Sequence, residues 1–128
     1  MLSWDASRHA LGVPEMDATH REFAALAREL ALASVADFPR LFDALADHTQ
    51  RHFDSESALM RRCGFPAIAE HEGEHRRVLG EMAQMRRSLA AGRTAMAREY
   101  VANGLPAWFA LHLATMDAAL AACLRRAR

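Results

Sequence analysis

The chain has 128 residues, and its 16 basic and 16 acidic side chains cancel to a formal net charge of zero. This length suits one compact domain with a sizeable core, and the balanced charge argues against a nucleic-acid partner. No run of about 20 uninterrupted apolar residues is present, so we expect no membrane-spanning helix. The first residues show no basic region followed by an apolar run, so we expect no secretory signal and a cytoplasmic location.

The composition favours helices over strands. Ala and Leu are abundant, aromatic residues make up 7% of the chain, and alternating runs of Val, Ile and Thr are absent. Four helical segments joined by short connections are expected to pack as antiparallel neighbours. We therefore predict an all-α, up-down-up-down four-helix bundle that forms one domain over residues 1–128, with an irregular N-terminal arm over about 1–16 and the bundle over about 17–127.

The first two helices have recognisable start and stop residues. Asp17 is a candidate N-cap for a helix over roughly residues 18–34, whose apolar side chains recur at helical spacing. Asp37, shortly before a proline, marks a second start, and this helix continues to Cys63. Gly64 follows at once, and we predict that it is the C-terminal cap.

Two further helices complete the bundle. Pro66 opens the third helix, which ends near Gly92. The fourth starts at about Thr94 and carries an apolar stripe that reaches Leu124. Its pattern is interrupted by the sequence Asn-Gly-Leu-Pro at residues 103–106, where we predict a kink or a restart.

Histidine and carboxylate side chains recur at helical spacing in the second and third helices. His52 and Glu56 are four residues apart, and so are His71 and His75. At 3.6 residues per turn, a spacing of four places two side chains on one face of a helix, one turn apart. Each pair can therefore contribute two ligands to one cluster.

The other two helices supply three more candidate ligands. His112 and Asp117 are five residues apart, which is about 140° around an ideal α-helix, so we expect them to flank a site rather than to stack. His20 lies three residues after Asp17. Every helix then contributes to a common interior, and the candidate set consists of five histidines and two carboxylates.

Seven ionisable side chains on the inner faces of a small bundle need partners. A single histidine on an apolar face means little, but burying the whole set without charge or metal would cost several kcal/mol for each carboxylate. Ligation by imidazole and carboxylate suits iron, manganese or zinc, and seven ligands exceed what one tetrahedral zinc can use. Two six-coordinate ions that share both carboxylates and one oxygen bridge would keep one open position for a small ligand.

Four segments of the chain resemble hemerythrins, especially bacterial ones. These segments are Asp17–His20, His52–Glu56, His71–His75 and Trp108–Asp117. Further matches to the family pattern are Trp4, Gly12–Val13 and Gly64–Pro66, so the resemblance spans nearly the whole chain.

This resemblance implies an oxo- or hydroxo-bridged centre of two iron ions that binds dioxygen reversibly. One iron would be held by His71, His75 and His112, and the other by His20 and His52. The two carboxylates, Glu56 and Asp117, would bridge the two irons. The iron with two histidines would keep the open position. The implied function is carriage, storage or sensing of dioxygen.

Three residues depart from the family pattern, and none of them is a ligand. Thr19 stands where glutamine is frequent, and Ser57 replaces a frequent glutamate. Phe109 occupies a position where a leucine commonly lines the oxygen pocket, so its ring is expected to narrow or reshape that cavity. Trp108 is the second residue expected at the oxygen pocket, where it would pack the apolar wall of the site. His48 is expected to lie beside the cluster or at the surface rather than to bind metal.

Two other functions stay open at this point. A di-iron bundle can also be an enzyme that reduces peroxide or nitric oxide, and sustained turnover with an electron donor would distinguish it from a dioxygen-binding protein. A helical interaction module with a structural metal would depend on that metal for folding without responding to oxygen. The sequence names no protein partner, and a sensor would need one.

Overall fold

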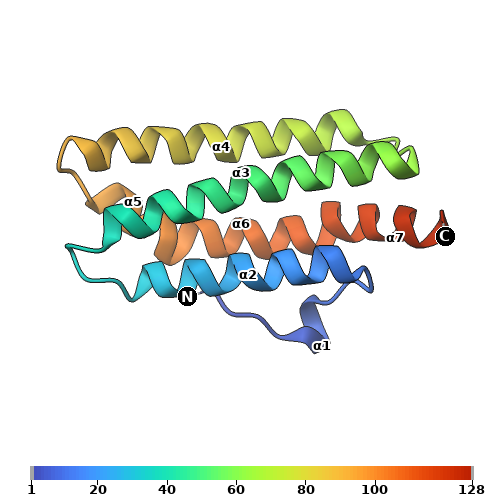
Figure 1. Cartoon of the computed structure of the whole chain (residues 1–128), viewed down its shortest axis with the longest axis horizontal. Helices are drawn as coiled ribbons and strands as arrows, with labels where there is room; N and C mark the ends of the chain where they lie inside the picture. Colours follow the sequence, from blue (N-terminus) through green and yellow to red (C-terminus); the bar gives the residue numbers. More distant parts are fainter. Residues whose placement is uncertain (1, 128) are drawn as a thin grey trace.

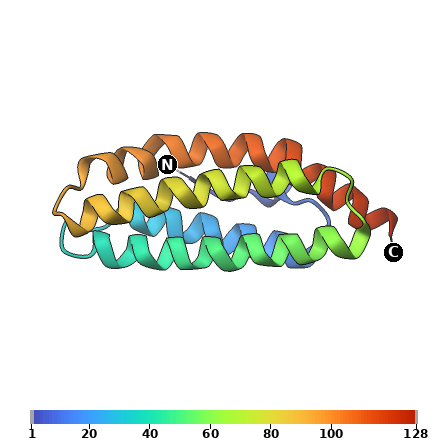
Figure 2. The ribbon, with the colours of Figure 1, turned by 90° about the horizontal axis from the view of Figure 1, so that it is seen from above.

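Four long helices run antiparallel, up and down in turn, in the computed structural model, which describes residues 2–127 (Figure 1). They are α2 (Pro14–Ala31), α3 (Phe38–Cys63), α4 (Ile68–Ala90) and a fourth helix over residues 95–126. Figure 2 shows the same four helices from above, aligned along the long axis of the bundle. The predicted all-α, up-down-up-down architecture is confirmed.

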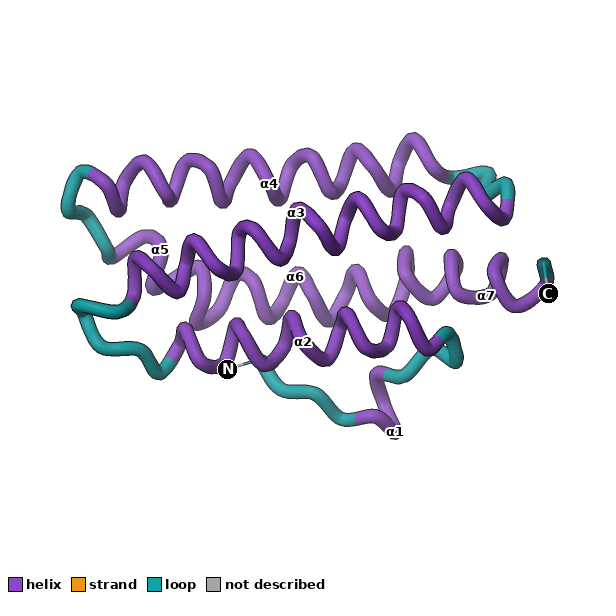
Figure 3. The backbone as a smooth tube through the Cα atoms, viewed as in Figure 1, coloured by secondary structure: helices purple, strands orange, loops and turns teal. Residues whose placement is uncertain are grey.

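The N-terminal arm runs beside α2 and contains one short helix (Figures 1 and 3). This helix, α1 (Ala6–His9), begins after Asp5, whose side chain accepts a hydrogen bond from the Ser7 amide at 3.0 Å. Leu2 is buried in the core, and Trp4 packs against the same apolar cluster. The arm therefore covers part of the bundle.

The first bundle helix starts at Pro14, earlier than the sequence indicated. Proline suits the first helical position because its φ is preset and it lacks the amide hydrogen that would have no partner there. Val13 is the N-cap residue, so the prediction that Asp17 caps this helix is wrong. The Asp17 carboxylate instead accepts hydrogen bonds from the amides of Leu11 at 2.8 Å and Gly12 at 3.3 Å, which fastens the arm to α2.

The connection between α3 and α4 is a tight turn at Gly64. Its φ of 65° and ψ of 44° are left-handed, and Gly64 is the C-cap of α3 as predicted. The Phe65 amide donates to the Met60 carbonyl at 2.9 Å, which satisfies one of the carbonyls left free at the helix end. The next helix begins at Ile68, two residues after Pro66.

The fourth helix is continuous and contains two π-helical turns. Its parts are α5 (Ala95–Glu99), η1 (Tyr100–Gly104), α6 (Leu105–His112), η2 (Leu113–Asp117) and α7 (Ala118–Arg126), and Figure 3 traces them as one helical path. The helix does not restart at residues 103–106, because the chain continues there through the π-helical turn η1. The Leu105 amide bonds to the Tyr100 carbonyl five residues back, and this wider turn accommodates Pro106, which has no amide hydrogen to donate.

By length and composition alone, this fourth helix would also be able to cross a membrane. It is the one helix among residues 2–127 that meets this test, and the mean hydropathy of its most apolar window is 1.5. The core helix of a bundle has the same properties, and 44% of that window is buried inside this structure. Its parts pack against α2, α3 and α4, as expected of a core helix.

A buried polar layer divides the apolar core into two clusters. The larger cluster includes Phe23, Phe42, Phe53, Met82 and Phe109, and the smaller one includes Met16, Met60, Phe65, Leu120 and Cys123. Along each long helix, the candidate ligands fall between members of the two clusters; on α2, for example, His20 lies between Met16 and Phe23. The polar layer is therefore enclosed by apolar packing at both ends.

Candidate metal centre

The seven candidate ligands from all four long helices come together in this polar layer. Each is at most 4% exposed, and the set is His20, His52, Glu56, His71, His75, His112 and Asp117. Each of the five histidines faces a carboxylate through its Nε2 atom. The structure thus brings the whole predicted set to one place.

Glu56 lies between histidines on two sides. Its Oε2 atom is 3.2 Å from Nε2 of His20 and 2.7 Å from Nε2 of His52. Its Oε1 atom is 3.2 Å from Nε2 of His71 and 3.1 Å from Nε2 of His75. One carboxylate oxygen therefore faces the α2 and α3 histidines, and the other faces the α4 histidines.

The two carboxylate oxygens of Asp117, on the fourth helix, also face different histidines. Its Oδ2 atom is 3.1 Å from Nε2 of His20. Its Oδ1 atom is 3.2 Å from Nε2 of His71 and 3.3 Å from Nε2 of His112. Both carboxylates therefore present one oxygen to each of two neighbouring groups of histidines.

The donor atoms form two groups that could each hold a metal ion. Within each group they lie within 4.8 Å of one another; the groups are Glu56, His71, His75, His112 and Asp117, and then His20, His52 and Glu56. Glu56 belongs to both, and Asp117 also reaches His20. This arrangement is the one that two adjacent ions bridged by carboxylates require.

The π-helical turn η2 brings His112 and Asp117 to the same point. On an α-helix they would be about 140° apart, and the prediction that they flank the site is wrong. In η2 the Ala118 amide donates to the Leu113 carbonyl, so a hydrogen bond spans five residues and side chains five apart return to one side. Such turns occur frequently at functional sites.

Several buried atoms of the cluster have no hydrogen bond among residues 2–127. They include both carboxylate oxygens of Asp117 and the Nε2 atoms of His75 and His112, although these four lie within ion-pair distance of a cluster member. The Nδ1 atoms of the five cluster histidines also lack a partner. Native proteins rarely leave so many buried polar atoms unsatisfied in one place. Nitrogen and oxygen donors without thiolate suit iron, so the residues present fit a pair of iron ions.

The chain is similar to known proteins over most of its length. Residues 11–124 match the family model described as the hemerythrin HHE cation binding domain. A bacteriohemerythrin of Ralstonia nicotianae is 39% identical over 117 residues, which cover 91% of this chain and 84% of that protein. This chain belongs to the hemerythrin family. A bacteriohemerythrin of Methylococcus capsulatus is 25% identical over 117 residues, which cover 83% of this chain and 89% of that protein.

The hemerythrin fold is also seen in a solved structure. A crystal structure of wild-type hemerythrin has a TM-score of 0.88 to this chain at 23% identity, and the match covers 97% of this chain and 98% of the other. The architecture is therefore shared across nearly the full length of both chains.

The two aromatic residues predicted to line the oxygen pocket lie at different parts of this hemerythrin's cluster. The ring of Phe109 is 4% exposed, and its centroid is 5.7 Å from that of His20 and 5.0 Å from that of Phe23. Trp108 instead stacks on His112, with ring centroids 4.6 Å apart and an angle of 22° between the planes. Phe109 therefore lies beside the donor group with two histidines, and Trp108 lies beside the donor group with three.

Two further residues of the site were missed by sequence reasoning. Glu74 accepts a hydrogen bond from Nε1 of Trp108 at 2.7 Å, which fixes the indole over His112. Phe53 stacks on His75 with ring centroids 3.7 Å apart and planes 2° from parallel. The sequence could have indicated a role at the site only for Phe53, because it is next to His52. The contact of Glu74 with Trp108 depends on how α4 and α6 pack, so no local pattern indicates it.

His48 lies beside the cluster and belongs to neither donor group. It is 9% exposed, and its Nε2 atom is 3.3 Å from Oε2 of Glu22.

The two departures from the family pattern that lie near the helix surfaces also have local partners. Thr19 donates to the Glu15 carbonyl at 2.9 Å, and Ser57 donates to the Glu72 carboxylate at 2.7 Å.

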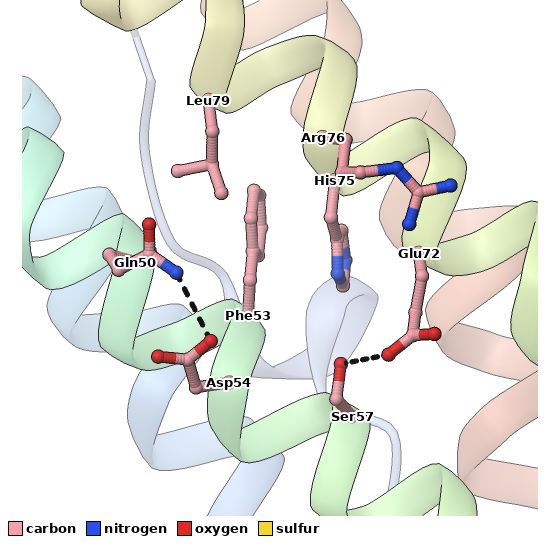
Figure 4. A pocket seen from close by; sticks show the side chains of 8 residues that line it. All are labelled: Gln50, Phe53, Asp54, Ser57, Glu72, His75, Arg76 and Leu79. Atoms are coloured by element: carbon pink, nitrogen blue, oxygen red, sulfur yellow. Dashed lines mark hydrogen bonds between the residues drawn. The ribbon is translucent and has the colours of Figure 1, made fainter.

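Two polar pockets reach the histidines from solvent. One, of about 190 Å³, lies between α3 and α4; Figure 4 shows His75 in it between the Phe53 ring and Glu72, with hydrogen bonds from Gln50 to Asp54 and from Ser57 to Glu72. The other, of about 170 Å³, lies between α2 and α3 and is lined by His52, His48 and Glu22 among others. A third, mainly apolar pocket between α4 and the fourth helix is lined by His71, so the cluster is enclosed but adjacent to several pockets.

Electrostatics within the metal-free cluster favour charged groups. Burial opposes protonation of His20 and His71, but contacts with Asp117 and Glu56 outweigh it and raise the pKa of His20 to about 10 and that of His71 to about 9. Burial also opposes ionisation of the carboxyl groups, yet the histidines hold the pKa of Glu56 and of Asp117 well below the usual range. For His75, burial dominates and lowers the pKa.

These shifts predict that the metal-free protein loses stability as the pH rises above neutrality. A histidine whose pKa is raised by folding stabilises the fold fully below its unfolded value of 6.5, and this contribution disappears as the pH passes its folded pKa. The melting temperature of metal-free protein should therefore fall by at least about 5 °C between pH 7 and pH 10. Circular dichroism melts would measure it.

The chain contains no lysine and one tyrosine, so the cysteine thiols are the main other side chains that titrate between pH 7 and pH 10. Because folding also raises the pKa of Cys63, a histidine variant is needed to isolate the contribution of the cluster. His20→Gln should flatten the dependence by removing the group with the higher of the two pKa values. A melting temperature that is constant or rises between pH 7 and pH 10 would contradict the assigned ion pairs.

Proposed function

We propose that this hemerythrin holds two iron ions in the cluster and binds dioxygen reversibly, for carriage, storage or sensing. The proposal rests on the orientation of two carboxylates, Glu56 and Asp117. In each, one oxygen faces one group of histidines and the other oxygen faces the neighbouring group. A single ion needs no such paired arrangement, whereas two bridged ions do.

The two iron sites would differ in their number of histidines. His71, His75 and His112 would hold one ion, His20 and His52 would hold the other, and Glu56 and Asp117 would bridge them. When bound, the iron pair would supply the chemistry of reversible dioxygen binding. The ion with fewer protein ligands is the one that can accept a further small molecule.

The protein's own contribution is to fix the ligands and to limit water. Phe53 stacks on His75, and Trp108 stacks on His112 while its indole N–H is held by Glu74. These contacts restrict ring rotation and keep both Nε2 atoms directed at the carboxylates. On the opposite side, Phe109 covers the edge of His20 with an apolar ring, which disfavours water beside the two-histidine group.

Iron stoichiometry tests the proposal at its simplest level. Titration of metal-free protein with ferrous iron, in the absence of oxygen, should saturate at two ions per chain. Saturation at one ion would contradict a di-iron centre and favour a mononuclear site built from one of the two donor groups.

Replacing Phe109 with leucine tests the pocket. Because the phenyl ring lies against His20 and Phe23, the smaller side chain should open space beside the two-histidine group and change the lifetime of the oxygenated form. The variant should lose only about 1 kcal/mol of stability, since both side chains are apolar. The lifetime would be measured as the decay of the oxygenated spectrum, by stopped-flow spectroscopy for fast decay and by conventional spectroscopy for slow decay. An unchanged lifetime would show that Phe109 does not line the pocket.

An enzyme that reduces peroxide or nitric oxide is the second candidate function. The two polar pockets favour it, because they give water and protons a route toward His75 and His52 that a sealed carrier would not need. Steady-state assays with an electron donor and either substrate distinguish the two functions. Sustained turnover would support the enzyme, and its absence together with reversible oxygenation would support the binding protein.

A further inference from the structure

A pair of thiols lies at the end of the bundle near the α3–α4 turn, outside the metal centre. Cys63 is the last residue of α3, and Cys123 lies on α7, 60 positions later. The Cys123 thiol donates to the Cys63 carbonyl at 3.3 Å, and the Cys63 thiol donates to the Met60 carbonyl at 3.7 Å. The Cys123 sulfur therefore lies against the backbone of Cys63.

The surroundings of the pair are apolar. Cys123 is 8% exposed within the smaller core cluster, which also contains Met16, Met60 and Leu120. Cys63 packs against the same cluster but is only half-buried, so a small oxidant from solvent reaches Cys63 first. Burial and the neighbouring Cys123 raise the pKa of the Cys63 thiol to about 11, so this thiol is protonated and slow to react at neutral pH.

We infer that Cys63 and Cys123 form an intramolecular disulfide when the protein is exposed to hydrogen peroxide. The Cys63 sulfur attacks one peroxide oxygen, which gives a sulfenic acid and releases the first water. The Cys123 sulfur then displaces the hydroxyl group from the Cys63 sulfur, which releases the second water and forms the S–S bond. Two thiols are oxidised, and one peroxide is reduced to two waters.

This bond would fasten the end of α3 to α7. Because it joins residues 60 positions apart, it should reduce the conformational freedom of the unfolded chain and raise the melting temperature. The inference depends on the thiols and not on iron, so it stands or fails separately from the proposed function.

The test treats the reduced, purified full-length protein with hydrogen peroxide after the reductant has been removed. Intact mass should fall by two hydrogen atoms, and both thiols should become unreactive. Tryptic digestion should yield residues 63–76 linked to residues 99–125, because cleavage after arginine leaves one cysteine in each peptide. The melting temperature should rise and return to its starting value after dithiothreitol.

Cys63→Ser and Cys123→Ser are the matched controls, since each keeps one thiol. Neither should show a rise in melting temperature on peroxide treatment. The inference is overturned if peroxide leaves both thiols free, if it oxidises Cys63 to a sulfinic acid while Cys123 stays reduced, or if the only disulfide joins two chains.

Discussion

Replacing Glu56 with glutamine should abolish the binding of both iron ions, the largest effect expected of any single substitution. Its carboxylate oxygens face four histidines at 2.7–3.2 Å, two on each side, so the change removes the shared negative charge from both donor groups. Even partners outside the ligand set typically cost 10–100-fold in metal affinity when removed, so a bridging ligand should cost more than about 100-fold. Iron analysis after dialysis would measure this loss.

Glu22→Gln is the matched control for this substitution. Glu22 is also next to a histidine, with Oε2 3.3 Å from His48, but it belongs to neither donor group. Its variant should keep the iron content of the parent protein. Equal iron content in the Glu56 and Glu22 variants would show that Glu56 is no bridge.

Replacing His75 with alanine should lower iron content and abolish any oxygen-dependent change in the visible spectrum. His75 is 3% exposed, faces Glu56 at 3.1 Å and is held by the Phe53 ring, so its loss removes an oriented donor from the three-histidine group. Alanine supplies no replacement ligand. Iron analysis and anaerobic-to-aerobic difference spectra would measure the two effects.

His48→Ala is the matched control, because it removes a buried imidazole that is not a predicted ligand. His48 is also buried, and its ring centroid is 6.1 Å from that of His52, but it points to Glu22 rather than to the cluster. Its variant should retain iron and oxygen response. Equal losses in the His48 and His75 variants would mean that the ligand assignment is wrong.

The bundle and the members of its polar cluster could be predicted because they depend on local periodicity. A spacing of four in a regular helix fixed the relation of His52 to Glu56 and of His71 to His75. Gly64 was predictable as a cap for a similar reason, since a left-handed residue is needed where α3 ends. These features do not require knowledge of how the helices pack.

The features that the sequence did not reveal depend on departures from regular geometry. His112 and Asp117 meet because η2 is a π-helical turn, which an ideal α-helical projection does not include. The first helix started earlier than predicted because Pro14 begins it, and Asp17 was then free to bond the arm. The link from Glu74 to Trp108 requires two packed helices, so no local pattern indicates it.

The most direct test of the account is the response of the iron-loaded protein to oxygen. Iron-loaded protein would be reduced without oxygen, exposed to air while the visible spectrum is recorded, and returned to vacuum. We expect two irons per chain and a spectral change on exposure that reverses under vacuum. A protein that passes directly to a stable oxidised spectrum, with no reversal, would contradict reversible dioxygen binding.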